Sequence, residues 1–145
     1  MDEINKSTDE LYELIETEPT EFIEKIETEK LTNYDTLFTN FFFQMLEEKG
    51  LSLAQLVNKT TISQSHIYQI AERRRRLSRD TAIVLAFAMK LDLEHTQKFL
   101  KYSNNAMLYP KVKRDAIIIC CIECGMTSEQ ANELLQNKSE KGLVF

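Results

Sequence analysis

Helix-start signals recur through this 145-residue chain, and they restrict its fold more than any other feature of the sequence. Five times, a serine, threonine or aspartate precedes a segment whose apolar residues follow helical spacing: Ser52, Ser63, Ser78, Asp92 and Thr127. Side chains of this type accept a hydrogen bond from a backbone N–H that the first helical turn leaves unpaired. Ser52 and Thr127 are each followed three residues later by glutamine, which completes a capping box. The pattern predicts a succession of short helices.

Apolar periodicity extends this prediction to seven helices after residue 36, none much longer than about four turns. The expected segments are 37–50, 52–59, 63–72, 78–90, 92–102, 111–125 and 127–138. Only 3 Gly and 2 Pro are present in the whole chain, which disfavours a fold built from strands and tight turns. The expected fold class is all-α. An apolar stripe in the first of these segments indicates either core or a dimer seam: Phe38, Phe41, Phe42 and Met45.

Charge is distributed unevenly along the chain. Residues 1–36 carry 12 acidic residues and 3 lysines, whereas residues 63–114 carry 11 basic and 4 acidic residues, so a formal net charge of −5 hides a basic region. The first stretch predicts an acidic helical leader in two short pieces, with Pro19 in the first turn of the second. Its apolar stripes predict docking on the main domain: Leu11, Leu14, Ile15, Phe22, Ile23 and Ile26. An alternative is that the leader covers the basic region and masks it from a partner.

Several classes of protein are disfavoured by the sequence. No apolar stretch approaches the ~20 residues of a membrane span, and the acidic first residues differ from a secretory signal. All three cysteines lie in CCIEC, which lacks the second pair of a zinc site and the βαβ context of a redox motif. We therefore expect a cytoplasmic protein with Cys120 and Cys124 as small core residues on one helix face. We expect neither a metal, a cofactor nor enzymatic activity, because no catalytic constellation can be assembled.

Part of the chain is repeated. Residues 79–100 overlay residues 114–135 after a shift of 35 positions, with Arg79 on Arg114 and Asp80 on Asp115. The overlay predicts two copies of one helical hairpin. Arg79 lies in a first helical turn, where a cation is not favoured, so we expect it to pair with Asp80 or another neighbour. Its counterpart Arg114 points to a structural role for both.

Residues 53–70 have the spacing of a helix-turn-helix. Two short helices are joined by a few residues, and apolar side chains recur where they can hold the helices together: Leu56, Ile62, Ile67 and Ile70. In this motif the second helix presents polar side chains to base edges in the major groove. Gln64, Ser65 and Gln69 are polar side chains at such positions, and glutamine can bind adenine through two hydrogen bonds.

Across residues 37–100 the chain resembles the lambda-repressor/Cro-like (XRE-type) family of helix-turn-helix DNA-binding domains. The resemblance implies a five-helix domain at 37–103, preceded by the leader at 1–36 and followed by a helical hairpin extension at 104–145. It also implies a sequence-specific transcriptional regulator that binds double-stranded DNA as a homodimer.

The resemblance also implies roles for individual residues. It places Gln64, Ser65 and Gln69 at base edges. The residues expected at phosphates are Ser52, Ser63, His66, Tyr68, Arg73, Arg74, Arg75 and Arg76. For Tyr68, packing inside the protein is an equal alternative. For the four arginines, the alternative is that they are solvated or that they pair with the protein's own acidic residues. Lys111 and Lys113 are expected to be solvated rather than part of this surface.

Four residues differ from the usual pattern of the family: Val57 stands for Ala, Thr61 and Arg73 for Gly, and Leu77 for Pro. Thr61 predicts a different turn or local strain, because glycine permits a positive φ there. Arg73 replaces a helix-ending glycine, which predicts that the recognition helix continues through residues 72–76. These differences favour an alternative of another class, a helical protein–protein interaction module that keeps the fold and binds an acidic partner without specific DNA binding.

Overall fold

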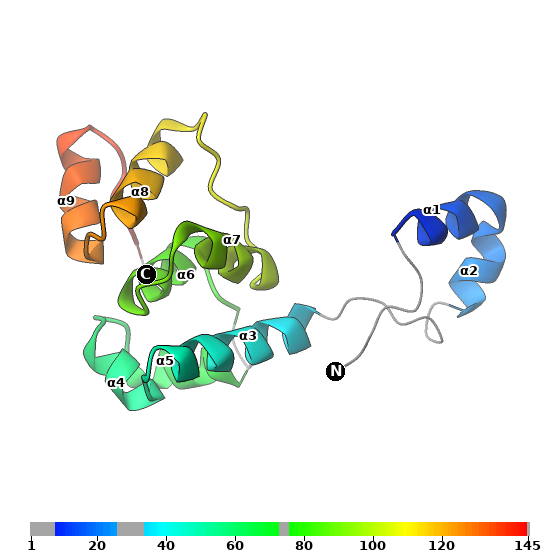
Figure 1. Ribbon diagram of the computed structural model, residues 1–145, viewed down its shortest axis with the longest axis horizontal. Coiled ribbons are helices and arrows are strands. Elements are labelled where there is room, and N and C mark those ends of the chain that lie inside the picture. Colours follow the sequence, from blue (N-terminus) through cyan, green and yellow to red (C-terminus); the bar gives the residue numbers. More distant parts are fainter. Residues whose placement is uncertain (1–7, 26–33, 73–75, 145) are drawn as a thin grey trace. The chain divides into compact units, whose positions relative to one another are not determined.

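The computed structural model describes residues 8–25, 34–72 and 76–144, and this part of the chain forms nine α-helices and no strand (Figure 1). The helices are α1 (Thr8–Thr17), α2 (Pro19–Lys25), α3 (Tyr34–Glu48), α4 (Leu53–Asn58), α5 (Gln64–Ala71), α6 (Arg79–Ala88), α7 (Leu93–Tyr102), α8 (Lys113–Glu123) and α9 (Ser128–Asn137). The all-α prediction is therefore confirmed. The chain divides into two compact units, Met1–Asn33 and Tyr34–Phe145.

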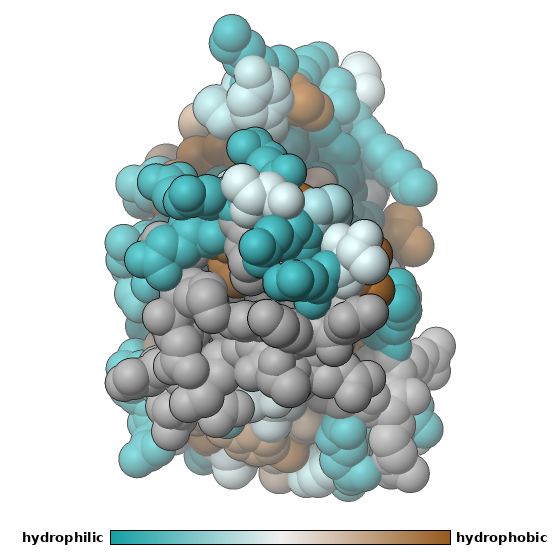
Figure 2. Space-filling model, turned by 90° about the vertical axis from the view of Figure 1, so that its right-hand side faces the viewer, coloured by the Kyte–Doolittle hydropathy of each residue, from teal (hydrophilic) through white to brown (hydrophobic). Residues whose placement is uncertain are grey.

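The first unit contains α1 and α2, which pack against each other. Pro19 begins α2, as expected from its sequence position. Within the predicted stripes, Leu11 is half-buried and Ile15 and Ile23 are exposed. The side chains of Leu14, Phe22 and Ile26 lie outside the described residues. On the face shown in Figure 2 the coloured residues are mostly hydrophilic, with apolar residues between them. Docking of the leader remains a prediction.

All five predicted N-caps form in the second unit. The side chains of Ser52, Ser63, Ser78, Asp92 and Thr127 each accept a hydrogen bond from the backbone N–H three residues ahead. The capping boxes at Ser52 and Thr127 are complete, because the glutamine side chain also accepts from the backbone N–H of the cap residue, at 2.8 and 2.9 Å. Local hydrogen bonding therefore sets where these helices begin.

The core of the second unit is organised around α6 and α7, which lie between α3–α5 on one side and α8–α9 on the other (Figure 1). Every residue of α6 from Thr81 to Phe87 is buried, so this helix forms the centre of the unit. A helix that is apolar on all sides requires cover from several directions. The remaining helices supply that cover, and they bury one stripe each.

An aromatic cluster joins α3 to α7. The ring of Phe99 on α7 lies 5.3 Å from Phe38, 5.7 Å from Phe42 and 6.4 Å from Phe41, all on α3. Rings at these separations attract each other beyond the effect of area burial. Together with the buried Met45, these residues confirm the apolar stripe predicted in the sequence, and the structure assigns it to the core of one chain.

The repeated sequence is a repeated structure. A shift of 35 residues places both ends of α7 on both ends of α9 and the last residue of α6 on the last residue of α8. The turn that follows each first helix carries one residue of positive φ, 55° at Lys90 and 68° at Gly125. The turn after each second helix repeats this, with 63° at Asn104 and 62° at Ser139. The two copies therefore share a backbone path, not only a helical periodicity.

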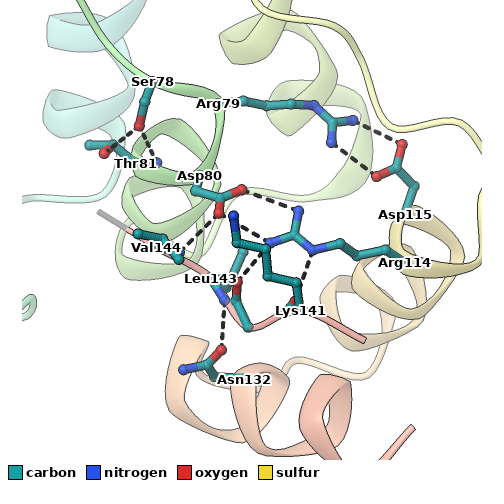
Figure 3. A network of polar contacts seen from close by, with 11 residues as sticks. Ser78, Arg79, Asp80, Thr81, Arg114, Asp115, Asn132, Lys141, Leu143 and Val144 are labelled. Atoms are coloured by element: carbon teal, nitrogen blue, oxygen red, sulfur yellow. Dashed lines mark hydrogen bonds and ion pairs between the residues drawn. The ribbon is translucent and has the colours of Figure 1, made fainter. Parts of the chain in front are cut away.

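Four charged residues join the two hairpins in a reciprocal Arg–Asp network (Figure 3). Arg79 of the first hairpin donates to both carboxylate oxygens of Asp115 in the second, at 3.0 and 2.9 Å. Arg114 of the second donates to both oxygens of Asp80 in the first, at 3.2 and 3.1 Å. Of the two partners expected for Arg79, Asp80 or another neighbour, the structure shows another neighbour, because each arginine pairs with the aspartate of the other copy. The structural role expected for Arg79 and Arg114 is confirmed. The two hairpins are therefore joined by two equivalent Arg–Asp pairs, which an approximate two-fold relation between the hairpins interchanges.

Replacing Lys90 with glycine is expected to stabilise the protein by about 1 kcal/mol, because a Cβ is disfavoured at positive φ. Gly125 already occupies the equivalent turn of the second hairpin. Thermal unfolding followed by circular dichroism should show a rise in Tm of about 3 °C. The matched control, Lys98→Gly in the middle of α7, is expected to lower Tm by a similar amount. A lower Tm for Lys90→Gly would contradict this interpretation of the turn.

Candidate nucleic-acid interface

Helices α4 and α5 form a compact pair held by the predicted apolar side chains. Leu56, Ile67 and Ile70 are fully buried, and Ile62 in the connecting turn is 5% exposed. Val57, where the family that the sequence resembles usually has alanine, is half-buried and packs against the same core. The larger side chain is therefore accommodated at the edge of the core. The two helices contact each other directly, as a helix-turn-helix requires.

The turn between the helices is shaped by Thr60. Its hydroxyl accepts a hydrogen bond from the N–H of Ile62 at 3.2 Å and donates to the carbonyl of Val57 at 3.4 Å. Among the described non-glycine residues only Lys90, Asn104 and Ser139 have a positive φ, so Thr61 does not. Of the two outcomes expected for Thr61, the structure shows the different turn, formed without a strained φ.

The predicted base-contacting residues differ in exposure. Gln64 and Ser65 in the first turn of α5 are exposed, and Gln69 is half-buried. Ile67 and Ile70, further along the helix, are fully buried. The helix therefore exposes its polar first turn to solvent while its apolar residues fix it to the domain.

The predicted phosphate-contacting residues fall into three groups. Ser52 and Ser63 are exposed N-caps, and each uses its hydroxyl oxygen as an acceptor, which leaves the hydroxyl hydrogen to donate. His66 and Tyr68 are half-buried, and Arg76 is exposed. Arg73, Arg74 and Arg75 lie outside the described residues.

Helix α5 does not extend as far as expected. It ends at Ala71, and Glu72 is its C-cap, with its N–H bonded to the carbonyl of Tyr68. Continuation of the helix into residue 72 is therefore wrong. Before α6 begins, Leu77 is buried and its carbonyl accepts a hydrogen bond from the side chain of Asn105 at 3.0 Å.

Two arginines of the basic region form ion pairs within the protein. Arg79 and Arg114 are held in the reciprocal Arg–Asp network, at side-chain exposures of 25% and 17%. Burial raises the pKa of Asp115, but the hydrogen bonds from Arg79 and from the N–H of Tyr109, together with the charges of Arg79 and Arg114, outweigh it, so the pKa lies below its ordinary value. Sequence analysis missed the carboxylate partners, although the 35-residue overlay aligned all four residues.

The cysteines differ from the expectation. Cys120 and Cys124 are exposed, whereas Cys121 is fully buried. The helical spacing that puts Cys120 and Cys124 on one face is correct, but the buried line of α8 runs through Asp115, Ile118 and Cys121. Burial raises the pKa of the Cys121 thiol, and its two neighbouring cysteines raise it further.

Within the described residues, no group of three His, Cys, Asp or Glu side chains is arranged to hold a metal ion. None of the helices described combines the length and apolar character that crossing a bilayer requires. Comparisons with protein-family models, with curated proteins and with solved structures find no match to this chain.

Proposed function

We propose that this chain is a sequence-specific DNA-binding transcriptional regulator, related in its mode of action to the lambda-repressor/Cro-like family, with α5 as the recognition helix. The observation that carries the proposal is the two-sided character of α5. Gln64 and Ser65 are exposed in its first turn, while Ile67 and Ile70 are fully buried one turn later. A helix anchored in this way can hold its first turn rigidly against base edges in the major groove.

Each polar residue then has a role that matches its chemistry. Gln64 binds adenine N6 and N7 through its amide, with Gln69 reading a position one turn further along the groove. The hydroxyls of Ser52 and Ser63 lie at the N-termini of α4 and α5, where backbone N–H groups also favour phosphate. Exposed Arg76, with the three arginines before it in the sequence, adds charge for adjacent phosphates. No cofactor enters this scheme.

The same proposal includes a homodimer in the cytoplasm. A single helix-turn-helix reads a few base pairs, and proteins of this class gain affinity by binding two half-sites about 34 Å apart. In the first hairpin, α6 contacts α9 and α7 contacts α8. These sides are therefore unavailable to a second copy, and the dimer contact must use another surface.

A second candidate, the protein–protein interaction module, is favoured by a different observation. The connection between α7 and α8 exposes three large apolar side chains within six residues: Met107 at 50%, Tyr109 at 54% and Val112 at 47%. Exposed apolar groups gathered in one segment are typical of contact surfaces for other proteins. Loss of partner binding without loss of DNA binding on Tyr109→Ser would assign this segment to such a role.

Arg76→Ala is expected to weaken binding to duplex DNA of mixed sequence and to reduce the slope of log affinity against log salt by about 1. The physical reason is that binding with one phosphate contact fewer releases one counterion fewer from the DNA. Fluorescence anisotropy of full-length protein between 50 and 200 mM salt measures this. Lys138→Ala, at the C-cap of α9, is the control and should leave the slope unchanged. Equal slopes for wild type and Arg76→Ala would remove Arg76 from the interface.

A further inference from the structure

The segment that connects the two hairpins is held along its backbone by fixed side chains. Arg79 donates to the carbonyls of Ala106 and Met107 at 2.8 and 3.0 Å. Asp115 accepts from the N–H of Tyr109 at 2.9 Å. Between these contacts the side chain of Leu108 is buried. Residues 106–109 are thus held as a short peptide, with two carbonyls and one N–H bound by the Arg79–Asp115 pair.

Residues 141–144, here called the strap, are held in the same way 35 positions later (Figure 3). Arg114 donates to the carbonyls of Lys141 and Gly142 at 2.9 and 3.0 Å. Asp80 accepts from the N–H of Val144 at 2.9 Å. The side chain of Leu143 is buried between them. The Arg114–Asp80 pair therefore binds the backbone of the strap, and one leucine side chain is buried between these contacts.

The two segments are not held equally. Gln97 both accepts from the N–H of Leu108 and donates to its carbonyl, at 2.7 and 2.8 Å. Asn132, the equivalent residue, accepts from the N–H of Leu143 at 2.7 Å, and no matching bond to the Leu143 carbonyl is present among the described residues. The strap is the more weakly held of the two.

The surface under the strap selects its occupant. A Cβ on Gly142 would lie 2.5 Å from Oδ1 of Asn132, so a side chain at that position would displace the amide oxygen that accepts from the N–H of Leu143. The side chain of Leu143 is 6% exposed. The side chains of Lys141 and Val144 are exposed, so they contribute little to recognition. The surface therefore favours a glycine followed by a leucine.

We propose that Asp80, Arg114 and Asn132 form a peptide-binding site for an extended Gly-Leu segment of another protein, and that the strap occupies this site as an intramolecular competitor. The ligand is bound through backbone groups and one leucine, which is how an extended peptide is recognised on a rigid surface. Such a site would add a protein partner to the chain, and it does not depend on the proposed DNA binding.

The first test uses the unmodified full-length chain and hydrogen exchange. We expect the backbone amides of Leu143 and Val144 to exchange at least 10-fold faster than those of Leu108 and Tyr109, because the strap opens locally. A synthetic peptide with the sequence of residues 138–144 (KSEKGLV) should accelerate exchange at Leu143 and Val144 alone when it displaces the strap. Equal exchange of the two segments, or no response to the peptide, would overturn the proposal.

The second test measures binding of the same peptide, labelled with fluorescein, to full-length variants. Leu143→Ala should bind it at least 10-fold more tightly than wild type, because the leucine of the peptide fills the vacated space. Leu108→Ala, the equivalent change in the other segment, should bind it as wild type does. A peptide with valine in place of the glycine should bind at least 10-fold more weakly. Equal affinity of Leu143→Ala and Leu108→Ala would contradict the site, and circular dichroism confirms that both variants are folded.

Discussion

Replacing Asp115 with alanine is expected to lower the free energy of unfolding by about 3 kcal/mol, which is among the largest effects available to a single polar substitution in this chain. The carboxylate is 4% exposed, and it binds both Arg79 and the N–H of Tyr109. Without it, the charge of Arg79 has no carboxylate partner and keeps only the carbonyls of Ala106 and Met107 as acceptors, and the N–H of Tyr109 loses its acceptor. Urea unfolding of wild type and variant gives the difference directly.

A surface carboxylate on the same helix serves as the control. Glu123 is exposed at the C-terminal end of α8, and Glu123→Ala is expected to change stability by less than about 0.5 kcal/mol. If Asp115→Ala were as mild as Glu123→Ala, the reciprocal Arg–Asp network would not be what closes the two hairpins on each other.

The same substitution should alter the response to acid. The pKa of Asp115 is lower in the folded protein than its ordinary value. Its contribution to stability is therefore fully present above the unfolded-state pKa, about 3.9, and is lost as pH falls through the lower folded-state pKa. Wild-type stability should decline below about pH 4, and Asp115→Ala should decline less over that range. A steeper decline in the variant would contradict the assigned direction.

Phe99→Ala is expected to lower the free energy of unfolding by about 3–5 kcal/mol, because it removes the ring around which three of the four phenylalanines of α3 pack. The side chain is fully buried, and the rigid helices on both sides limit how far the space can close. Phe43→Ala is the matched control, since Phe43 is 43% exposed on α3, and it should cost less than about 1 kcal/mol. Similar losses for the two variants would show that α7 does not depend on this cluster.

The parts of the fold that could be predicted from the sequence are those fixed by short-range chemistry. Each N-cap side chain bonds to a backbone N–H three residues away. A residue such as Ser52 or Asp92 therefore predicts a helix start from the local sequence alone. The buried faces of α4 and α5 follow from apolar spacing in the same way. For the candidate interface, this reasoning identified the motif and the exposed first turn of α5.

Features that depend on distant partners could not be predicted in this way. Arg79 binds a carboxylate 36 positions away, and the nearest acid in sequence, Asp80, binds Arg114 instead. The end of α5 at Ala71 is not marked by a glycine or proline in residues 72–78, so the sequence carries no local stop signal there. Which face of α8 is buried depends on its place against α7 and α9, so helical spacing alone assigned Cys120 and Cys124 to the wrong side.

The two hairpins share a backbone path, but their side chains differ at the positions where only the first hairpin meets α3. On α7 the positions that meet α3 carry His95, Phe99 and Tyr102, all in ring contact with Phe41. A shift of 35 residues places Gln130, Leu134 and Asn137 there on α9. Gln130 and Asn137 are exposed, so aromatic residues would gain little at these positions. The backbone path is retained while the exposed face has changed.

The most direct test of the proposed function is selection of bound duplexes from a random DNA pool by the full-length protein. The proposal predicts enrichment of one sequence, arranged as two half-sites about 34 Å apart, and Gln64→Ala should relax preference at one position in each half-site while leaving the rest unchanged. Failure to retain any DNA at low salt, or retention with no enriched sequence, would contradict the assignment of α5 as a recognition helix.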